Sequence, residues 1–159
     1  MAAAPDISWS GPNGTFNLRA AAVIRRGDEI LLCTVGDLGY WFLPGGRVRL
    51  GEASEVALAR ELAEELGHQL PVGDLAFVVE NIFAADGIQQ HEIGLYYHVA
   101  WPGTLDPDDL RRGGELGHTF SWTGIRSLAS VEFQPAGLVP VLQSRPDALR
   151  HVVLDRPEP

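Results

Sequence analysis

Residues 45–68 read GGRVRLGEASEVALARELAEELGH, and this stretch decides the fold. A glycine pair opens it, a short polar loop follows, and a helical segment closes it. Ser54 is a good N-cap, and Gly67 stands where helices commonly end in a left-handed residue, so we predict a helix from Ser54 to Leu66. Its apolar side chains share one side of a helical wheel: Val56, Leu58, Ala59, Leu62, Ala63 and Leu66.

Three carboxylates of this helix, Glu61, Glu64 and Glu65, are expected close together on a second face. With Glu61 at zero on the wheel, Glu65 lies about 40° to one side and Glu64 about 60° to the other, so we expect all three opposite the apolar side chains. Like charges at this spacing destabilise a helix, and Arg60 can reach Glu64 but cannot neutralise three acids. The remaining repulsion predicts a bound divalent cation. Carboxylate oxygens are hard ligands, which favours Mg²⁺, with Mn²⁺ as the alternative, over zinc.

The same acids also fit a solvated face of a surface helix, because runs of charge usually only solvate. The segment ahead of the helix favours a site instead. Gly45 and Gly46 let the backbone turn sharply and bring a carbonyl close to an ion. Glu52 comes just before the helix, where it could cap the N-terminus or pair with Arg60.

The arrangement of Gly46, five residues, Glu52, seven residues and then Arg60-Glu61-Leu62-x-Glu64-Glu65-x-Gly67 resembles the Nudix box of the MutT-type hydrolases. The preceding segment, Trp41-Phe42-Leu43-Pro44-Gly45-Gly46, looks like the usual approach to that box. One position departs from the pattern: His68 stands where the family normally has an aliphatic residue, which concerns packing at the helix end more than catalysis.

The resemblance implies a Nudix fold, an α+β (α/β/α) sandwich in which helices flank a mixed sheet and the box forms a loop–helix–loop. It implies hydrolysis of the pyrophosphate bond in a nucleoside diphosphate linked to another group. The implied catalytic and metal-binding residues are Glu61, Glu64 and Glu65, with the Gly46 carbonyl as a further ligand. Gly45, Glu52, Arg60 and Gly67 would shape the loop and the helix.

The general base varies within this family. Glu61 is our first choice, and the candidates outside the box are Glu92, Glu115 and Glu132. Four other side chains are candidates for substrate binding: Arg19, Arg47, Phe83 and His91. For each a structural role is the alternative: an ion pair for the arginines, a place in the core for the phenylalanine, and an ordinary hairpin position for the histidine.

The rest of the chain is read as strands, turns and one more helix. Apolar runs between turn signals predict strands at Phe16–Ile24, Glu29–Thr34, Leu75–Asn81, Glu92–Ala100, Thr119–Thr123 and His151–Leu154. A second helix is expected from Pro135 to Ser144, and residues 102–117 are expected to form a long polar loop. We expect residues 1–15 to be a loose N-terminal tail and residues 16–155 to form a single domain.

Composition narrows the class of function. The chain has 159 residues and a formal net charge of −9, a surface that repels nucleic acid and anionic lipid. No apolar run reaches the length of a membrane span, and no signal-peptide pattern opens the chain, so a cytoplasmic location is expected. The expected partner is a small nucleotide diphosphate derivative. The sequence leaves homodimer formation open, and Cys33 is expected to be a buried thiol.

Two alternative functions remain at this point. A sanitising pyrophosphatase for oxidised nucleoside triphosphates would use the same box with a different base pocket. A Nudix-like domain that senses a nucleotide without cutting it belongs to another class, and the intact acidic helix argues against it. The substrate itself stays open among nucleotide sugars, dinucleotides and nucleoside triphosphates.

Overall fold

The computed structural model describes residues 4–105, 110, 117–144 and 148–155. Its strands are β1 (Ser8–Gly11), β2 (Gly14–Arg26), β3 (Glu29–Val35), β4 (Gly45–Arg47), β5 (Val72–Ala85), β6 (Ile88–Ala100), β7 (His118–Gly124) and β8 (Arg150–Asp155). The helical elements are α1 (Ser54–Leu66), the 3₁₀ helices η2 (Ile125–Ser130) and η3 (Ala136–Leu138), and α3 (Val139–Ser144). None of these described helices is long and apolar enough to cross a membrane.

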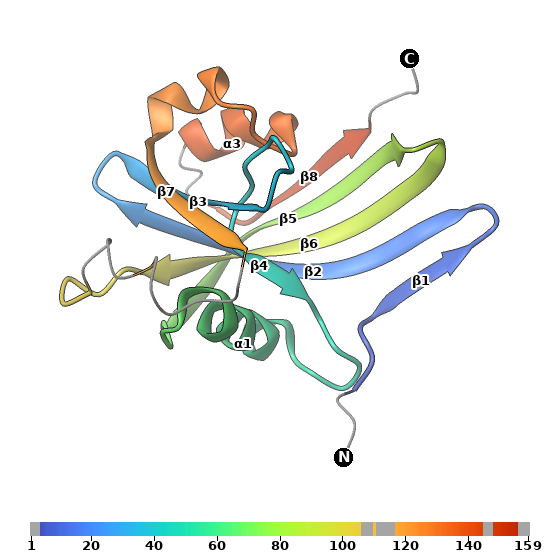
Figure 1. The fold of residues 1–159 in the computed structure, drawn as a ribbon, viewed down its shortest axis with the longest axis horizontal. Coiled ribbons are helices and arrows are strands. Elements are labelled where there is room, and N and C mark those ends of the chain that lie inside the picture. The colour runs from blue at the N-terminus through green and yellow to red at the C-terminus, as the bar shows by residue number, and fades with distance from the viewer. Residues whose placement is uncertain (1–3, 106–109, 111–116, 145–147, 156–159) are drawn as a thin grey trace.

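A mixed sheet organises the molecule. Its main order is β7-β3-β2-β6-β5-β8, and β1 and β4 each pair with β2 outside that path. The β2–β6 and β5–β8 pairs are parallel, whereas the other pairs are antiparallel. Helix α1 covers one face of the sheet, and η2, η3 and α3 cover the other (Figure 1). The mixed sheet flanked by helices confirms the predicted α+β (α/β/α) sandwich.

Two hydrophobic cores lie on the two faces of the sheet. Alternating residues of β2 enter each core: Ala20 and Ala22 pack on the α1 side, whereas Ala21 and Val23 pack on the α3 side. A strand covered on both faces is apolar without alternation, which is why residues 20–24 are all buried. The predicted buried thiol is confirmed, because Cys33 lies in the α1-side core and is fully buried.

Strand β2 changes its antiparallel partner along its length. Its beginning pairs with β1, and its middle pairs with β4, from Arg19↔Arg47 to Ala21↔Gly45. Its end pairs with β3 only at Arg25 and Arg26. Strands β3 and β4 therefore pair with different parts of β2 and separate from each other. Where they separate, residues of α1 and residues on the opposite face of the sheet border the same opening.

The predicted N-terminal tail is wrong over most of its length. Strand β1 lies within residues 1–15 and pairs with β2. Backbone hydrogen bonds also tie the segment before it to the box loop, because the Ile7 amide donates to the Val48 carbonyl and the Leu50 amide donates to the Pro5 carbonyl. Alanine, glycine and serine suggested a loose segment, but backbone pairing to an edge needs no particular side chains.

Other differences concern boundaries. The second helix, predicted as one piece from Pro135, is divided into η3 and α3. The predicted loop at 102–117 lies largely outside the described residues. The single domain at 16–155 stays a prediction.

Candidate active site

A cavity of about 1210 Å³ opens beside the division between β3 and β4. It is bounded by the glycine pair, the C-terminal half of α1, and the wall that β5 and β6 form on the α3 side of the sheet. Its acidic, arginine and histidine lining residues are Asp6, Arg19, Arg47, Arg49, Glu61, Glu65, Glu92 and His118. Two of the three acids predicted on α1 therefore face this cavity.

Glu65 is buried, with 4% of its surface exposed. Its Oε2 accepts a hydrogen bond of 3.1 Å from the amide of Gly45. The Nε2 of His118, on β7, lies 3.5 Å from its Oε1. The Cys33 thiol lies nearby, and burial, followed by the charge of Glu65, raises its pKa above the ordinary range. Glu65 thus joins α1 to β4 and β7 at the point where the sheet divides.

Glu61 lies against Gly46. A Cβ on Gly46 would overlap the Glu61 carboxyl group, so the absence of a side chain at residue 46 makes room for this acid. On its other side, Glu61 Oε1 accepts a hydrogen bond of 2.6 Å from Nη1 of Arg60. Glu61 is consequently held between the glycine pair and a guanidinium.

Arg60 joins the box loop to the helix. Its Nε and Nη2 donate to the two carboxylate oxygens of Glu52 at 2.9 and 3.0 Å, and Nη2 also donates to the carbonyl of Arg47 at 3.1 Å. These hydrogen bonds hold the pKa of Glu52 below its ordinary value. Glu52 also accepts a hydrogen bond from the backbone amide of Arg49. The pairing of Glu52 with Arg60, one of two roles open from the sequence, is the one that the structure contains.

The predicted common face of three carboxylates is wrong. Glu64 is exposed and pairs with Arg60 at 3.4 Å and Arg49 at 3.9 Å, away from the cavity lining. Glu65 lies on the buried side of α1 with Leu58 and Leu62, while Val56, predicted on the apolar side, is 55% exposed. The acids therefore divide between the cavity and solvent.

The carbonyl of the glycine pair that is free of the β2–β4 ladder is that of Gly45, whereas the resemblance implied Gly46. The Ala22 amide donates to the Pro44 carbonyl and the Val48 amide donates to the Leu18 carbonyl, so the Ala20–Gly46 pair between them is a hydrogen-bonded pair of the ladder. The Gly46 carbonyl thus points toward β2. The Gly45 carbonyl points away from β2 and accepts a hydrogen bond of 3.2 Å from Nη2 of Arg19.

These donors fit a hard divalent cation. Among the described residues, no three Asp, Glu, His or Cys side chains converge as a complete ligand set. Mg²⁺ does not require such a set, because it is commonly held by one or two carboxylates, with water and substrate phosphate completing its octahedron. Glu61, Glu65 and the Gly45 carbonyl supply oxygen donors of that kind on one side of the cavity.

The residues predicted to bind substrate divide into two groups. Arg19, Arg47 and Phe83 line the cavity. The Arg19 Nη1 lies 3.9 Å from Glu92, and the Arg47 Nη1 lies 3.8 Å from Asp6. His91 does not belong to the cavity lining. It points to the other face of β6, where its Nε2 lies 2.9 Å from Glu80 and its ring meets Phe16 edge-on.

The outside candidates for the general base also divide. Glu92 lines the cavity, whereas Glu132 is exposed and is absent from that lining. Glu115 lies outside the described residues.

The cavity also contains polar residues that were not predicted as site residues, among them His118 and Asn81. His118 directly precedes the predicted strand Thr119–Thr123, and Asn81 ends the predicted strand Leu75–Asn81. A strand pattern does not mark a polar side chain as functional.

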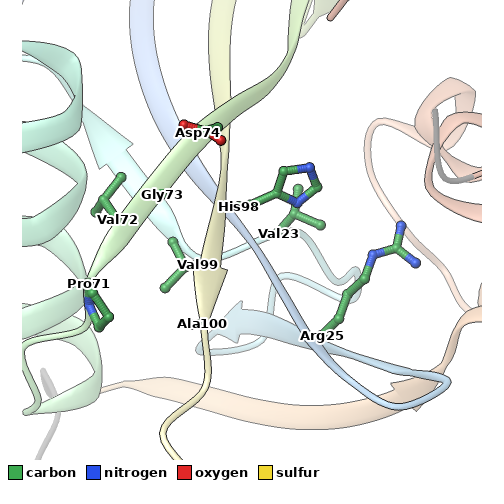
Figure 2. Close-up of a pocket in the computed structure, with 9 residues that line it drawn as sticks. All are labelled: Val23, Arg25, Pro71, Val72, Gly73, Asp74, His98, Val99 and Ala100. Atoms are coloured by element: carbon green, nitrogen blue, oxygen red, sulfur yellow. The ribbon is translucent and has the colours of Figure 1, made fainter. Parts of the chain in front are cut away.

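A smaller cavity of about 440 Å³ lies on the α3 side, beside irregular pairing near the start of β5. Figure 2 shows Arg25, Asp74 and His98 around it. None of the site residues predicted from the sequence lines this second cavity.

The similarity of this chain to known proteins includes the region of this candidate site. The model of the NUDIX domain family matches residues 15–142. A Mycobacterium tuberculosis protein provisionally named 8-oxo-dGTP diphosphatase 2 is 66% identical over 38 residues, which make up 24% of this chain and 26% of that protein. The nucleoside triphosphatase NudI of Salmonella arizonae is 48% identical over 58 residues, 33% of this chain and 41% of the relative. The matched stretches span less than half of the curated relatives that this chain resembles.

The solved structures agree on the fold. The crystal structure of a MutT NUDIX hydrolase from Burkholderia pseudomallei superposes with a TM-score of 0.57 at 28% identity, covering 82% of this chain and 97% of that one. The family match extends over most of the chain and includes the glycine pair, α1 and the cavity wall formed by β5 and β6. The chain belongs to the Nudix family.

Proposed function

We propose that this chain is a metal-dependent pyrophosphohydrolase that cuts a phosphoanhydride bond of a nucleoside triphosphate or a related nucleoside diphosphate derivative. One observation carries the proposal: two carboxylates, Glu61 and Glu65, meet the glycine pair at the rim of a cavity that also contains arginines. An acidic centre beside cationic side chains suits a ligand that is itself anionic and arrives with divalent cations.

Glu61, Glu65 and the Gly45 carbonyl would hold Mg²⁺, with Mn²⁺ as the alternative, and Glu64 would take part only through water. A bound cation would polarise the diphosphate and lower the pKa of a water molecule. Arg19 and Arg47 would contact phosphate oxygens, which orients the scissile bond. Glu61 remains our first choice for the group that accepts the proton of the attacking water.

The relatives favour nucleoside triphosphates within the substrate class. One carries the name nucleoside triphosphatase and another the provisional name 8-oxo-dGTP diphosphatase. Sanitising of oxidised triphosphates, left open by the sequence, thereby becomes the second candidate activity. Cytoplasmic location and homodimer formation stay predictions.

Glu65→Gln tests the proposal. The substitution keeps the shape of the side chain and its contact with Gly45 but removes the charge. We expect hydrolysis of nucleoside triphosphates with Mg²⁺ or Mn²⁺ to fall by orders of magnitude while the circular dichroism spectrum is retained. Glu55→Gln is the matched control, because Glu55 is an exposed acid in the first turn of the same helix.

A second readout separates the metal from the chemistry. Mg²⁺ or Mn²⁺ should raise the melting temperature of the wild type and of Glu55→Gln, but not that of Glu65→Gln. An unchanged hydrolysis rate in Glu65→Gln would refute the metal assignment. Tight nucleotide binding by the wild type with no turnover of any nucleotide sugar, dinucleotide or triphosphate would favour the sensor function instead.

A further inference from the structure

Asn81 contributes an unusual polar group to the wall of the main cavity. It lies on β5 and lines the cavity, although only 5% of its surface is exposed. Its Oδ1 is buried and, among the described residues, has no hydrogen-bond partner. Buried acceptors are nearly always paired, so an unpaired one beside a cavity calls for a donor from outside the chain.

Glu92 lies beside Asn81 on the neighbouring strand β6. The two residues are directly opposite in the β5–β6 register, and both line the cavity. Side chains opposite each other in an antiparallel pair lie on the same face with Cβ atoms about 5 Å apart. The Glu92 side chain is 18% exposed and its nearest charged partner, Arg19, is 3.9 Å away. The wall therefore presents two neighbouring hydrogen-bond acceptors.

Aromatic surface accompanies these acceptors. Phe83 follows Asn81 by two residues on the same face of β5, and it lines the cavity together with Tyr96 of β6. Phe133 borders the cavity from the segment before η3. A flat, unsaturated ring suits such a wall, since aromatic side chains can stack against it. The phosphates are expected at the charged centre formed by Glu61 and Glu65. The end of the ligand that carries no phosphate would therefore contact this wall.

We propose that Asn81 and Glu92 determine base specificity by accepting hydrogen bonds from two adjacent N–H donors of a guanine-type base. Guanine presents its N1–H beside its exocyclic amino group. Adenine and cytosine each place one amino group beside a ring acceptor, and thymine and uracil have one N–H between two carbonyls. The proposal rests on the proposed function, and it assigns Glu92 to base binding rather than to proton transfer.

Nucleoside monophosphates test this inference independently of hydrolysis. Isothermal titration calorimetry would compare dGMP with dIMP, which keeps N1–H but lacks the amino group, and with dAMP. We expect the wild type to bind dGMP about tenfold more tightly than dIMP, since one hydrogen bond to a buried acceptor is at stake. Asn81→Leu should bring the ratio of the two affinities close to one, whereas Asn81→Asp, which keeps an acceptor, should preserve it.

Asn17→Ala is the matched control. Asn17 is a buried asparagine on the other side of Glu92 in the β2–β6 register, its Oδ1 accepts from Ser8, and it does not line the cavity. Its dGMP-to-dIMP ratio should match the wild type. A comparison of GMP with dGMP identifies a sugar hydroxyl as the donor if only that pair responds to Asn81→Leu, and this result would overturn the proposal.

The outcomes also separate the two proposals. Equal wild-type affinity for dGMP and dIMP, or no binding of any monophosphate, would overturn base recognition by Asn81 and Glu92. Selective binding of dGMP combined with no hydrolysis of any nucleotide sugar, dinucleotide or nucleoside triphosphate would leave base recognition standing and refute the proposed function alone. Retention of the dGMP preference in Asn81→Leu would likewise overturn the inference.

Discussion

Glu65 occupies a place on α1 that its neighbours already indicate. Leu58, Leu62 and Glu65 follow one another at i, i+4 and i+7, so the acid belongs to the same stripe as two buried leucines. Burying a carboxylate is unfavourable unless hydrogen bonds or opposite charge compensate. The Gly45 amide and the His118 ring supply those contacts. The helical wheel centred on Glu61 placed Glu65 with the other two acids and did not indicate that Glu65 is buried beside these leucines.

The glycine pair gives a prediction at the same scale. Gly45 has φ of +138°, and a Cβ there would overlap the backbone of Ala20 and Ala21. Gly45→Ala should therefore destabilise the fold by about 2 kcal/mol through backbone strain and loss of β2–β4 pairing. At Gly46 the obstacle is only the end of the Glu61 side chain. Gly46→Ala should retain most stability and lose activity.

Urea denaturation and a hydrolysis assay on both variants would distinguish the two positions. Each variant serves as the control for the other, because the added methyl group is the same. Equal loss of stability in both, or full activity in Gly46→Ala, would contradict the placement of Glu61 against Gly46.

The junction between the box loop and α1 depends on one ion pair. Glu52 has a pKa below its ordinary value of 4.5 because Arg60 donates two hydrogen bonds to it. A carboxyl group whose pKa is lower in the folded state stabilises the fold above its unfolded pKa. This contribution is lost as the pH falls through the folded pKa. The junction should therefore weaken in acid below about pH 4.5.

Glu52→Gln tests this behaviour. We expect the variant to be less stable than the wild type by about 2 kcal/mol at pH 7, and the difference to shrink as the pH is lowered from 5 toward 3. Melting temperatures measured across this range would report the difference. Glu29→Gln is a suitable control because it also removes an acid paired with an arginine, but at an exposed turn. A difference that stays constant with pH would contradict the assigned cause.

Strand β1 gives a second prediction at the scale of elements. It pairs with β2, and the segment before it pairs with the box loop through Ile7 and Pro5. Removing residues 1–11 should lower the melting temperature by roughly 5 °C and reduce activity, since the box loop loses a backbone partner. Removing residues 1–4 keeps these contacts and is the control. Equal melting temperatures for the two truncations would show that β1 does not support the loop.

The success of prediction from the sequence differs between elements for physical reasons. Helix α1 was predicted from Ser54 to Leu66 and is confirmed with those bounds, because its periodicity and Gly67 are local signals. The predicted N-cap role of Ser54 is wrong, since Ala53 occupies the N-cap and the Ser54 hydroxyl instead pairs with the Tyr97 hydroxyl at 2.6 Å. The strand β1 and the division between β3 and β4 depend on pairing with distant segments, which leaves little trace in the segments themselves. The acids Glu61 and Glu65 were identified from the sequence as candidate site residues, but the direction in which each side chain points depends on what α1 packs against.

The charge of the whole molecule bears on how an anionic ligand approaches. The formal net charge is −9, and the cavity lining contains three arginines and four acids. The side chains of the cavity therefore do not offset the negative electrostatic potential of the molecule. Without a divalent cation, a triphosphate is repelled over distances of about 10 Å at 0.1 M salt.

We therefore expect added NaCl to strengthen triphosphate binding when a chelator is present. Raising NaCl from about 20 mM to about 300 mM should improve the affinity several-fold, and Mg²⁺ should remove or reverse this trend. Calorimetry with a non-hydrolysable triphosphate would measure it. Affinity that falls with salt in the chelator would show that the arginines dominate the local field.

The change of partner along β2 separates two tasks between independent parts of the chain. The groups proposed to act on phosphate come from α1, β4 and Arg19 of β2, whereas the wall proposed to meet the base comes from the β5–β6 hairpin. Substitutions in the hairpin can therefore alter one end of the ligand without disturbing the other. Over evolutionary time, such a layout lets descendants keep a common chemistry while they diverge in the molecules they accept.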